Sequence, residues 1–124
     1  MKGRTLRWAA GIALVVGLSS ASAAVDEDFM RYLEDVFKSG DNHIALKDLD
    51  GATKDAKELA ELFAEVEAHY VKEADEKDGL KLARQANELS NNLVKVLVAN
   101  DFGSAASLSI EIARNCKSCH NIYK

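Results

Sequence analysis

The residues best suited to chemistry are two cysteines and a histidine near the end of the chain. Cys116 and Cys119 are the only cysteines, and His120 directly follows the second of them. The spacing C-x-x-C-H is the pattern through which c-type haem is attached covalently. On a helix, two thiols three residues apart can each form a thioether with one haem vinyl group, and the adjacent imidazole can reach the iron. We therefore predict one covalent haem c, tethered by Cys116 and Cys119 and ligated by His120.

Three other uses of the paired cysteines fit less well. A redox-active C-x-x-C is expected near the start of a helix in a βαβ unit, whereas this one follows a helical pattern. A structural zinc site needs a fourth ligand and usually a second C-x-x-C, which the sequence lacks. A disulfide across two intervening residues closes too small a loop to stabilise the chain much. Haem attachment is the favoured interpretation.

Four predicted helices must position this motif. Apolar residues recur every three or four positions over residues 26–39, 44–74, 80–99 and 104–123, and turns containing glycine separate these segments. The chain contains no proline, which favours uninterrupted helices. No segment alternates with a period of two residues, so no sheet is expected. The pattern predicts an all-α fold, an antiparallel up-down-up-down four-helix bundle with the haem near its C-terminal end.

The other features of these segments are expected to have no role in the site. The pattern places His43 in an exposed turn and His69 on the flank of the second helix, so we interpret both as surface or boundary histidines rather than iron ligands. Gly40 is expected just beyond the first helix as its C-terminal cap. A run of acids opposite the apolar stripe of the second helix is expected to be solvated; its members are Asp55, Glu58, Glu61 and Glu65.

The first 23 residues have a different composition. Basic residues at positions 2, 4 and 7 precede an apolar run over 8–18, and small residues follow, ending in Ala21-Ser22-Ala23. This arrangement is typical of a cleaved secretory signal peptide. The apolar run is well short of the roughly 20 residues that span a bilayer. We expect a periplasmic protein without stable membrane insertion, with residues 24–124 forming one cytochrome c domain.

Removal of the leader leaves an acidic chain. All 20 acidic residues lie after residue 25, whereas 3 of the 16 basic residues lie in the leader, so the remainder has a net charge of −7. This charge argues against a nucleic-acid partner, which requires a basic surface. It favours redox partner proteins with basic docking surfaces, and either a monomer or a homodimer is compatible with it. No catalytic serine triad or phosphate-binding loop is present in the sequence, so an enzyme is not predicted.

The combination of these features resembles the class II c-type cytochromes, the cytochrome c′ superfamily. A leader, four predicted helices and C-x-x-C-H close to the C-terminus agree with that family, whose motif continues as H-x-x-Y-[RK]. Tyr123 and Lys124 match the last two positions of that motif. The resemblance extends over essentially the whole chain after the leader, although only the last helix matches by motif. It implies a four-helix bundle with one haem, tuned electrostatically by Lys124.

The resemblance leaves two possibilities for the sixth position of the iron. One branch of the family places a methionine from the first helix on the iron and carries electrons, whereas the other leaves this face open and binds diatomic gases. Met30 is the only methionine after the leader and shares a helix face with Leu33 and Phe37. We therefore expect Met30 to ligate the iron of a one-electron carrier that cycles between Fe(II) and Fe(III). In the alternative, Met30 only packs in the core, Phe29 and Leu33 cover an open face, and the protein binds nitric oxide or carbon monoxide.

Overall fold

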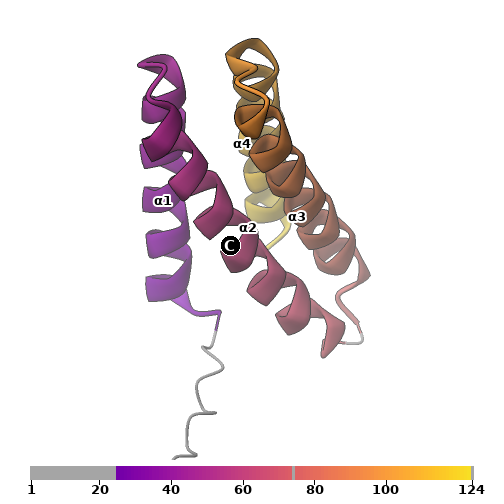
Figure 1. Ribbon diagram of the computed structural model, residues 1–124. Helices are drawn as coiled ribbons and strands as arrows, with labels where there is room; N and C mark the ends of the chain where they lie inside the picture. Colours follow the sequence, from indigo (N-terminus) through magenta and orange to yellow (C-terminus); the bar gives the residue numbers. More distant parts are fainter. Residues whose placement is uncertain (1–24, 74, 124) are drawn as a thin grey trace, which may run out of the picture.

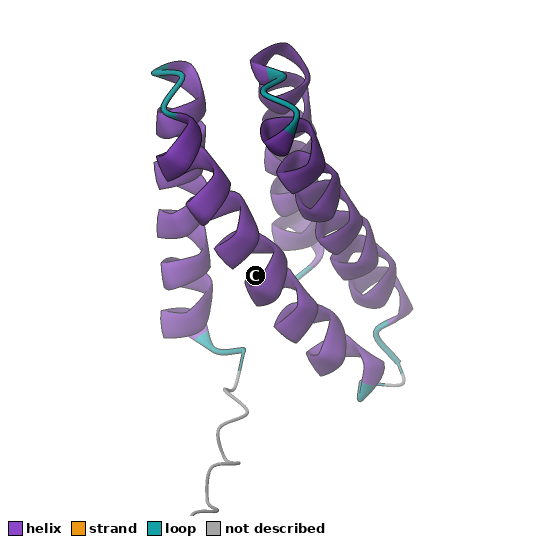
Figure 2. Cartoon of the chain, viewed as in Figure 1, coloured by secondary structure: helices purple, strands orange, loops and turns teal. Residues whose placement is uncertain are grey.

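The computed structural model describes residues 25–73 and 75–123, and these contain four helices and no strand. The helices lie side by side and are joined by short loops (Figure 1, Figure 2). They are α1 (Glu27–Ala45), α2 (Leu49–Val71), α3 (Lys77–Val98) and α4 (Phe102–Ile122). The prediction of an all-helical fold of four packed helices is confirmed. The predicted signal peptide and Lys124 lie outside the described residues.

One apolar core lies between the helices. Leu97 and Ile112 are fully buried, and Leu33 and Leu59 are nearly so. Burying a leucine side chain stabilises the fold by about 1.5–3 kcal/mol. Helix α2 packs against both α1 and α3, and α3 packs against α4, while α1 and α4 make the fewest contacts of the adjoining pairs. Within residues 25–73 and 75–123, no helix is both long and apolar enough to cross a membrane.

Three of the four helices begin at an aspartate. The carboxylates of Asp26, Asp48 and Asp101 each accept a hydrogen bond from the backbone N–H three residues further on. Such a bond satisfies one of the amides that the first turn of a helix leaves without a backbone partner. Helix α3 is different, because Glu76 occupies the same position and makes no side-chain bond to the helix start.

Helix α1 extends further than the sequence pattern predicts. The pattern ends it at Ser39, with Gly40 outside, but the helix continues to Ala45. Gly40 is buried, and a Cβ added there would lie 3.3 Å from the Cβ of Asp55 on α2. The glycine therefore lies where two helices approach closely and does not end α1. The left-handed residue that follows the helix is Lys47, with a φ of 56°.

The bounds of the next two helices also differ from the prediction. Residues 44–74 were expected to form one helix, but α2 begins only at Leu49, after the capping carboxylate of Asp48. Helix α3 was expected after Gly79, yet it begins at Lys77 and includes that glycine in its first turn. Helix α4 lies within two residues of its expected bounds.

Asp55 departs from the expected solvated face. Its Oδ2 atom accepts a hydrogen bond from the Ser39 hydroxyl at 2.7 Å and lies 2.7 Å from Nδ1 of His43. The Asp55 side chain is only 13% exposed, so this part of the prediction is wrong, whereas Glu61 and Glu65 are exposed as predicted. The placement of His43 in an exposed turn is also wrong. Helix α1 continues past Gly40 to Ala45, so His43 lies in its last turn, where it contacts Asp55 of α2.

Candidate functional site

A hollow of about 280 Å³ lies between α1 and α4. Helix α1 contributes Met30, Leu33 and Phe37 to its wall, and α4 contributes Cys116 and His120. The other lining residues are Glu34, Lys38, Ala113 and Lys117. Three of the four predicted site residues, Met30, Cys116 and His120, are thus brought together from the first and the last helix.

The wall that α1 provides follows from helix geometry. Met30, Leu33 and Phe37 are spaced by three and four residues, so they lie in one row on the helix surface. Leu33 is 2% exposed and belongs to the core, while Met30 and Phe37 are partly buried against it. The prediction that these three residues share an inward face is confirmed. Phe29, which was expected to cover an open iron face, also packs against the core but is not part of the wall.

Cys116 lies on the floor of the hollow. Burial, together with the smaller effects of nearby Cys119 and Glu34, raises the pKa of its thiol to about 11. The thiol is therefore protonated at neutral pH. A dithiol oxidoreductase needs the opposite, a cysteine whose pKa is lowered so that the thiolate can attack. The environment of Cys116 is therefore unlike that of the attacking cysteine in disulfide exchange.

Cys119 has different surroundings from Cys116. It does not line the hollow but lies beside Tyr70 at the end of α2. Burial raises the pKa of the Cys119 thiol, while a hydrogen bond with Tyr70 acts in the other direction. Both thiols are free. Because Cys116 and Cys119 are three residues apart on one helix, they occupy neighbouring positions on its surface, one lining the hollow and one beside Tyr70.

His120 is exposed at the mouth of the hollow rather than buried. The helical spacing of Leu108, Ile112, Cys116 and His120 predicts that the motif continues the buried stripe of the last helix. Ile112 is buried, and Leu108 and Cys116 pack partly buried against the core, but for His120 the prediction is wrong. The buried residues of α4 are Ala105, Ser109, Ile112 and Asn115. This row faces the other helices, whereas His120 faces the sparsely packed side toward α1.

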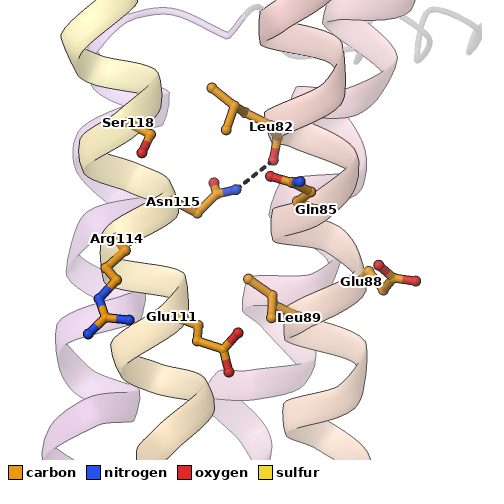
Figure 3. Close-up of a pocket in the computed structure, with 8 residues that line it drawn as sticks. All are labelled: Leu82, Gln85, Glu88, Leu89, Glu111, Arg114, Asn115 and Ser118. Carbon is orange, nitrogen blue, oxygen red and sulfur yellow. Dashed lines mark hydrogen bonds between the residues drawn. The ribbon is translucent and has the colours of Figure 1, made fainter.

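A second, more polar groove of about 380 Å³ lies between α3 and α4 (Figure 3). Asn115 on its floor is 9% exposed and donates a hydrogen bond to the backbone oxygen of Leu82 at 3.0 Å. Ser118, between the two cysteines of the motif, lies along the same groove (Figure 3). None of the predicted site residues lines it. The two grooves therefore divide the surface of α4, and only the α1 side carries the expected ligands.

The groups around the α1–α4 hollow fit a haem. An imidazole and a thioether are both axial ligands of haem iron, and a thiol supplies a covalent tether. Leu33 and Phe37 offer apolar contact for a macrocycle. Lys117 places a positive charge on the lining, where an acidic substituent would be favoured, whereas Lys38 pairs with Glu34 of the same lining at 3.9 Å. The volume of about 280 Å³ lies just below the roughly 300–1,000 Å³ typical of ligand pockets.

The other histidines take no part in this hollow. His43 pairs with Asp55, and the ring of His69 packs edge-on against Tyr70 at a centroid distance of 5.0 Å. In the part of the chain that the structure describes, no three His, Cys, Asp or Glu side chains converge as ligands of a metal ion would.

Comparison with protein-family models, with curated proteins and with solved structures finds no match. The candidate site rests on the spacing of the cysteine motif and on the geometry of the hollow.

Proposed function

We propose that this protein is an exported mono-haem c-type cytochrome that acts as a one-electron carrier. Haem c would be linked to Cys116 and Cys119, with His120 and Met30 as iron ligands, in an antiparallel up-down-up-down bundle. The observation that carries the proposal is the α1–α4 hollow, which Met30, Cys116 and His120 line together. When bound, the haem would supply an iron that alternates between the ferrous and ferric states.

The residues of the chain would determine how that iron behaves. The thioether of Met30 is a soft ligand that favours ferrous iron, so pairing it with the imidazole of His120 would raise the reduction potential. Leu33 and Phe37 would exclude water from the methionine side. Because α1 and α4 belong to one packed core, the same two ligands would be retained in both oxidation states.

The partners we propose are redox proteins with basic docking surfaces. The chain after residue 23 has a net charge of −7, and the acids are concentrated on α1 and α2. A complementary basic surface would be steered toward them over a distance of about 10 Å at ordinary ionic strength. We propose neither a nucleic-acid partner nor an enzymatic activity, and the active unit would be a monomer or a homodimer. Export to the periplasm rests on the signal-peptide pattern of residues 1–23.

One observation favours a second function, the binding of nitric oxide or carbon monoxide. Met30 packs against the core and lies beside Leu33 and Phe37, as a methionine with a purely structural role would. If its sulfur does not ligate the iron, the same wall would form an apolar pocket over an open coordination position. A small uncharged diatomic ligand would fit that pocket best.

Three measurements on the purified protein test the proposal. The intact mass should equal that of residues 24–124 plus one haem, and the colour should survive acid–acetone extraction. The absorption spectra should be low-spin in both oxidation states. A folded protein without haem, with two thiols that react with iodoacetamide, would overturn the proposal. High-spin, five-coordinate spectra would replace the carrier with the gas-binding function.

A further inference from the structure

Helix α3 takes its cap from a residue 44 positions further along the chain. In α1, α2 and α4, the aspartate that precedes the helix accepts a hydrogen bond from the backbone N–H three residues further on. Glu76, which precedes α3, makes no such bond. The corresponding amide of α3 belongs to Gly79, and it donates to the phenolic oxygen of Tyr123 at 3.0 Å. The hydroxyl of Tyr123 therefore takes the place of the missing aspartate, from a position just after α4. The carboxylate of Glu76 lies beside the same hydroxyl.

Gly79 is required at this point by a close contact. A Cβ added to Gly79 would lie 2.6 Å from Cε1 of Tyr70, which is too short for two carbon atoms that are not bonded to each other. The absence of a side chain lets the Tyr70 ring lie directly on the first turn of α3. The Tyr70 and Tyr123 rings also pack together, with centroids 5.4 Å apart. Three segments, the end of α2, the start of α3 and the end of α4, thus meet at one end of the bundle.

This contact lies next to the cysteine motif. Tyr70 also touches Cys119, and the backbone N–H of Tyr123 is bonded to the Cys119 oxygen at 2.9 Å. Cys119 and His120 belong to the last turn of α4, where helices usually fray because the final carbonyls have no partner. An attachment of Tyr123 to a neighbouring helix opposes that fraying.

We propose that Tyr123 is a positioning residue, which caps α3 and thereby holds the last turn of α4, so that His120 keeps a fixed place at the hollow and Cys119 keeps a fixed place beside Tyr70. Tyr70 supports it by packing between Gly79 and Cys119. The role of the cap in the fold is independent of any ligand, whereas its effect on His120 rests on the proposed haem function.

The test is Tyr123→Phe in the full chain, which keeps the ring and removes the hydroxyl. Tyr32→Phe is the matched control, because Tyr32 also donates its hydroxyl to a glutamate, Glu58, but lies on α1 away from the motif. Hydrogen exchange of the Gly79 amide should become roughly fivefold to tenfold faster in Tyr123→Phe, as expected for loss of one neutral hydrogen bond. The control should leave this rate unchanged. An unchanged rate in Tyr123→Phe would overturn the cap.

The reduction potential and the absorption spectrum of the haem test the positioning role. In Tyr123→Phe the reduction potential should shift, or a second spectral form should appear, while Tyr32→Phe should match the wild type in both. Faster exchange together with an unchanged potential and spectrum would leave the cap but overturn the positioning role. If the wild type carries no haem, the proposed function fails, and the role is then read from the ratio of Cys119 to Cys116 alkylation. That ratio should rise several-fold in Tyr123→Phe, and a constant ratio would overturn the positioning role.

A second variant tests the part played by Tyr70. Gly79→Ala forces the Tyr70 ring away from α3 while leaving both tyrosines in place. The exchange rate and the haem or alkylation readout should change in the same direction as in Tyr123→Phe. If Gly79→Ala instead behaves like the wild type in both readouts, Tyr70 does not support the cap.

Discussion

Met30 on α1 and His120 on α4 line one hollow, although they lie near opposite ends of the described chain. The two residues come from α1 and α4, which make the fewest contacts of the adjoining helix pairs. A ligand that bridges them would add contacts where the protein itself supplies few. The relationship between these two side chains therefore decides whether the hollow acts as a two-ligand iron site or as an open pocket.

Replacing Met30 with leucine should separate ligation from packing. Leucine has a similar volume, so the free energy of unfolding should change by less than about 1.5 kcal/mol. Loss of the thioether should convert the iron to a high-spin form that binds carbon monoxide readily in the ferrous state. Absorption spectra with and without carbon monoxide measure this. Phe29→Leu, outside the wall, should leave the spectra unchanged, and a low-spin Met30→Leu protein would show that the sulfur is not the ligand.

The two cysteines should differ in their importance for attachment. Because Cys116 lines the hollow and Cys119 does not, Cys116→Ala should lower the fraction of haem-bearing protein more than Cys119→Ala. The double variant should contain no covalent haem. Intact mass spectrometry counts the attached haem in each case, with Ser118→Ala as the control inside the same motif. Equal losses in the two single variants would contradict this assignment.

The Cys116 thiol should titrate unusually late in the haem-free protein. Burial raises its pKa from an ordinary value near 9 to about 11, so its alkylation rate should keep rising up to about pH 11. Because ionisation is easier in the unfolded chain, the contribution of this thiol to stability is complete below pH 9 and decreases as the pH rises toward 11. Iodoacetamide kinetics against pH measure the titration. The urea-unfolded chain is the control, and its rate should level off near pH 9; the same profile in the folded protein would refute the prediction.

Asp55 should matter for stability despite its place in an acidic run. Asp55→Ala leaves the donors of Ser39 and His43 without their shared acceptor, which should cost about 1–3 kcal/mol. Glu61→Ala, at an exposed position on the same helix, should change stability by no more than about 0.5 kcal/mol. Urea unfolding of both variants gives the comparison. Similar values for the two would mean that the Asp55 contacts add nothing.

The association with a redox partner should depend on salt. Since the chain after the leader has a net charge of −7, a basic partner should be attracted at a distance, and added salt should screen that attraction. Stopped-flow electron transfer should therefore slow as the ionic strength rises from low to physiological values. A rate that is constant or rises with salt would exclude steering by a basic surface.

Local patterns in the sequence predicted the four helices and placed the cysteine motif on the last of them. Helix periodicity depends on residues three or four apart, and the C-x-x-C-H spacing lies within two turns of one helix, so neither needs knowledge of distant contacts. The same kind of pattern placed Met30 correctly in a row with Leu33 and Phe37. Local signals failed at Gly40, which looks like a helix end, because a glycine that ends a helix and one that allows close packing are identical in sequence.

Only the tertiary structure decided which residues meet across helices. The contact of Gly40 with Asp55, the shared hollow of Met30 and His120, and the bond from Gly79 to Tyr123 each join segments far apart in the chain. Such contacts depend on how helices pack and rotate against one another, which periodicity alone does not specify. The sequence by itself thus determined the helices and the chemistry that the last of them carries. The packing of α1 and α3 against α4 decided which side chains surround that chemistry and what holds it in place.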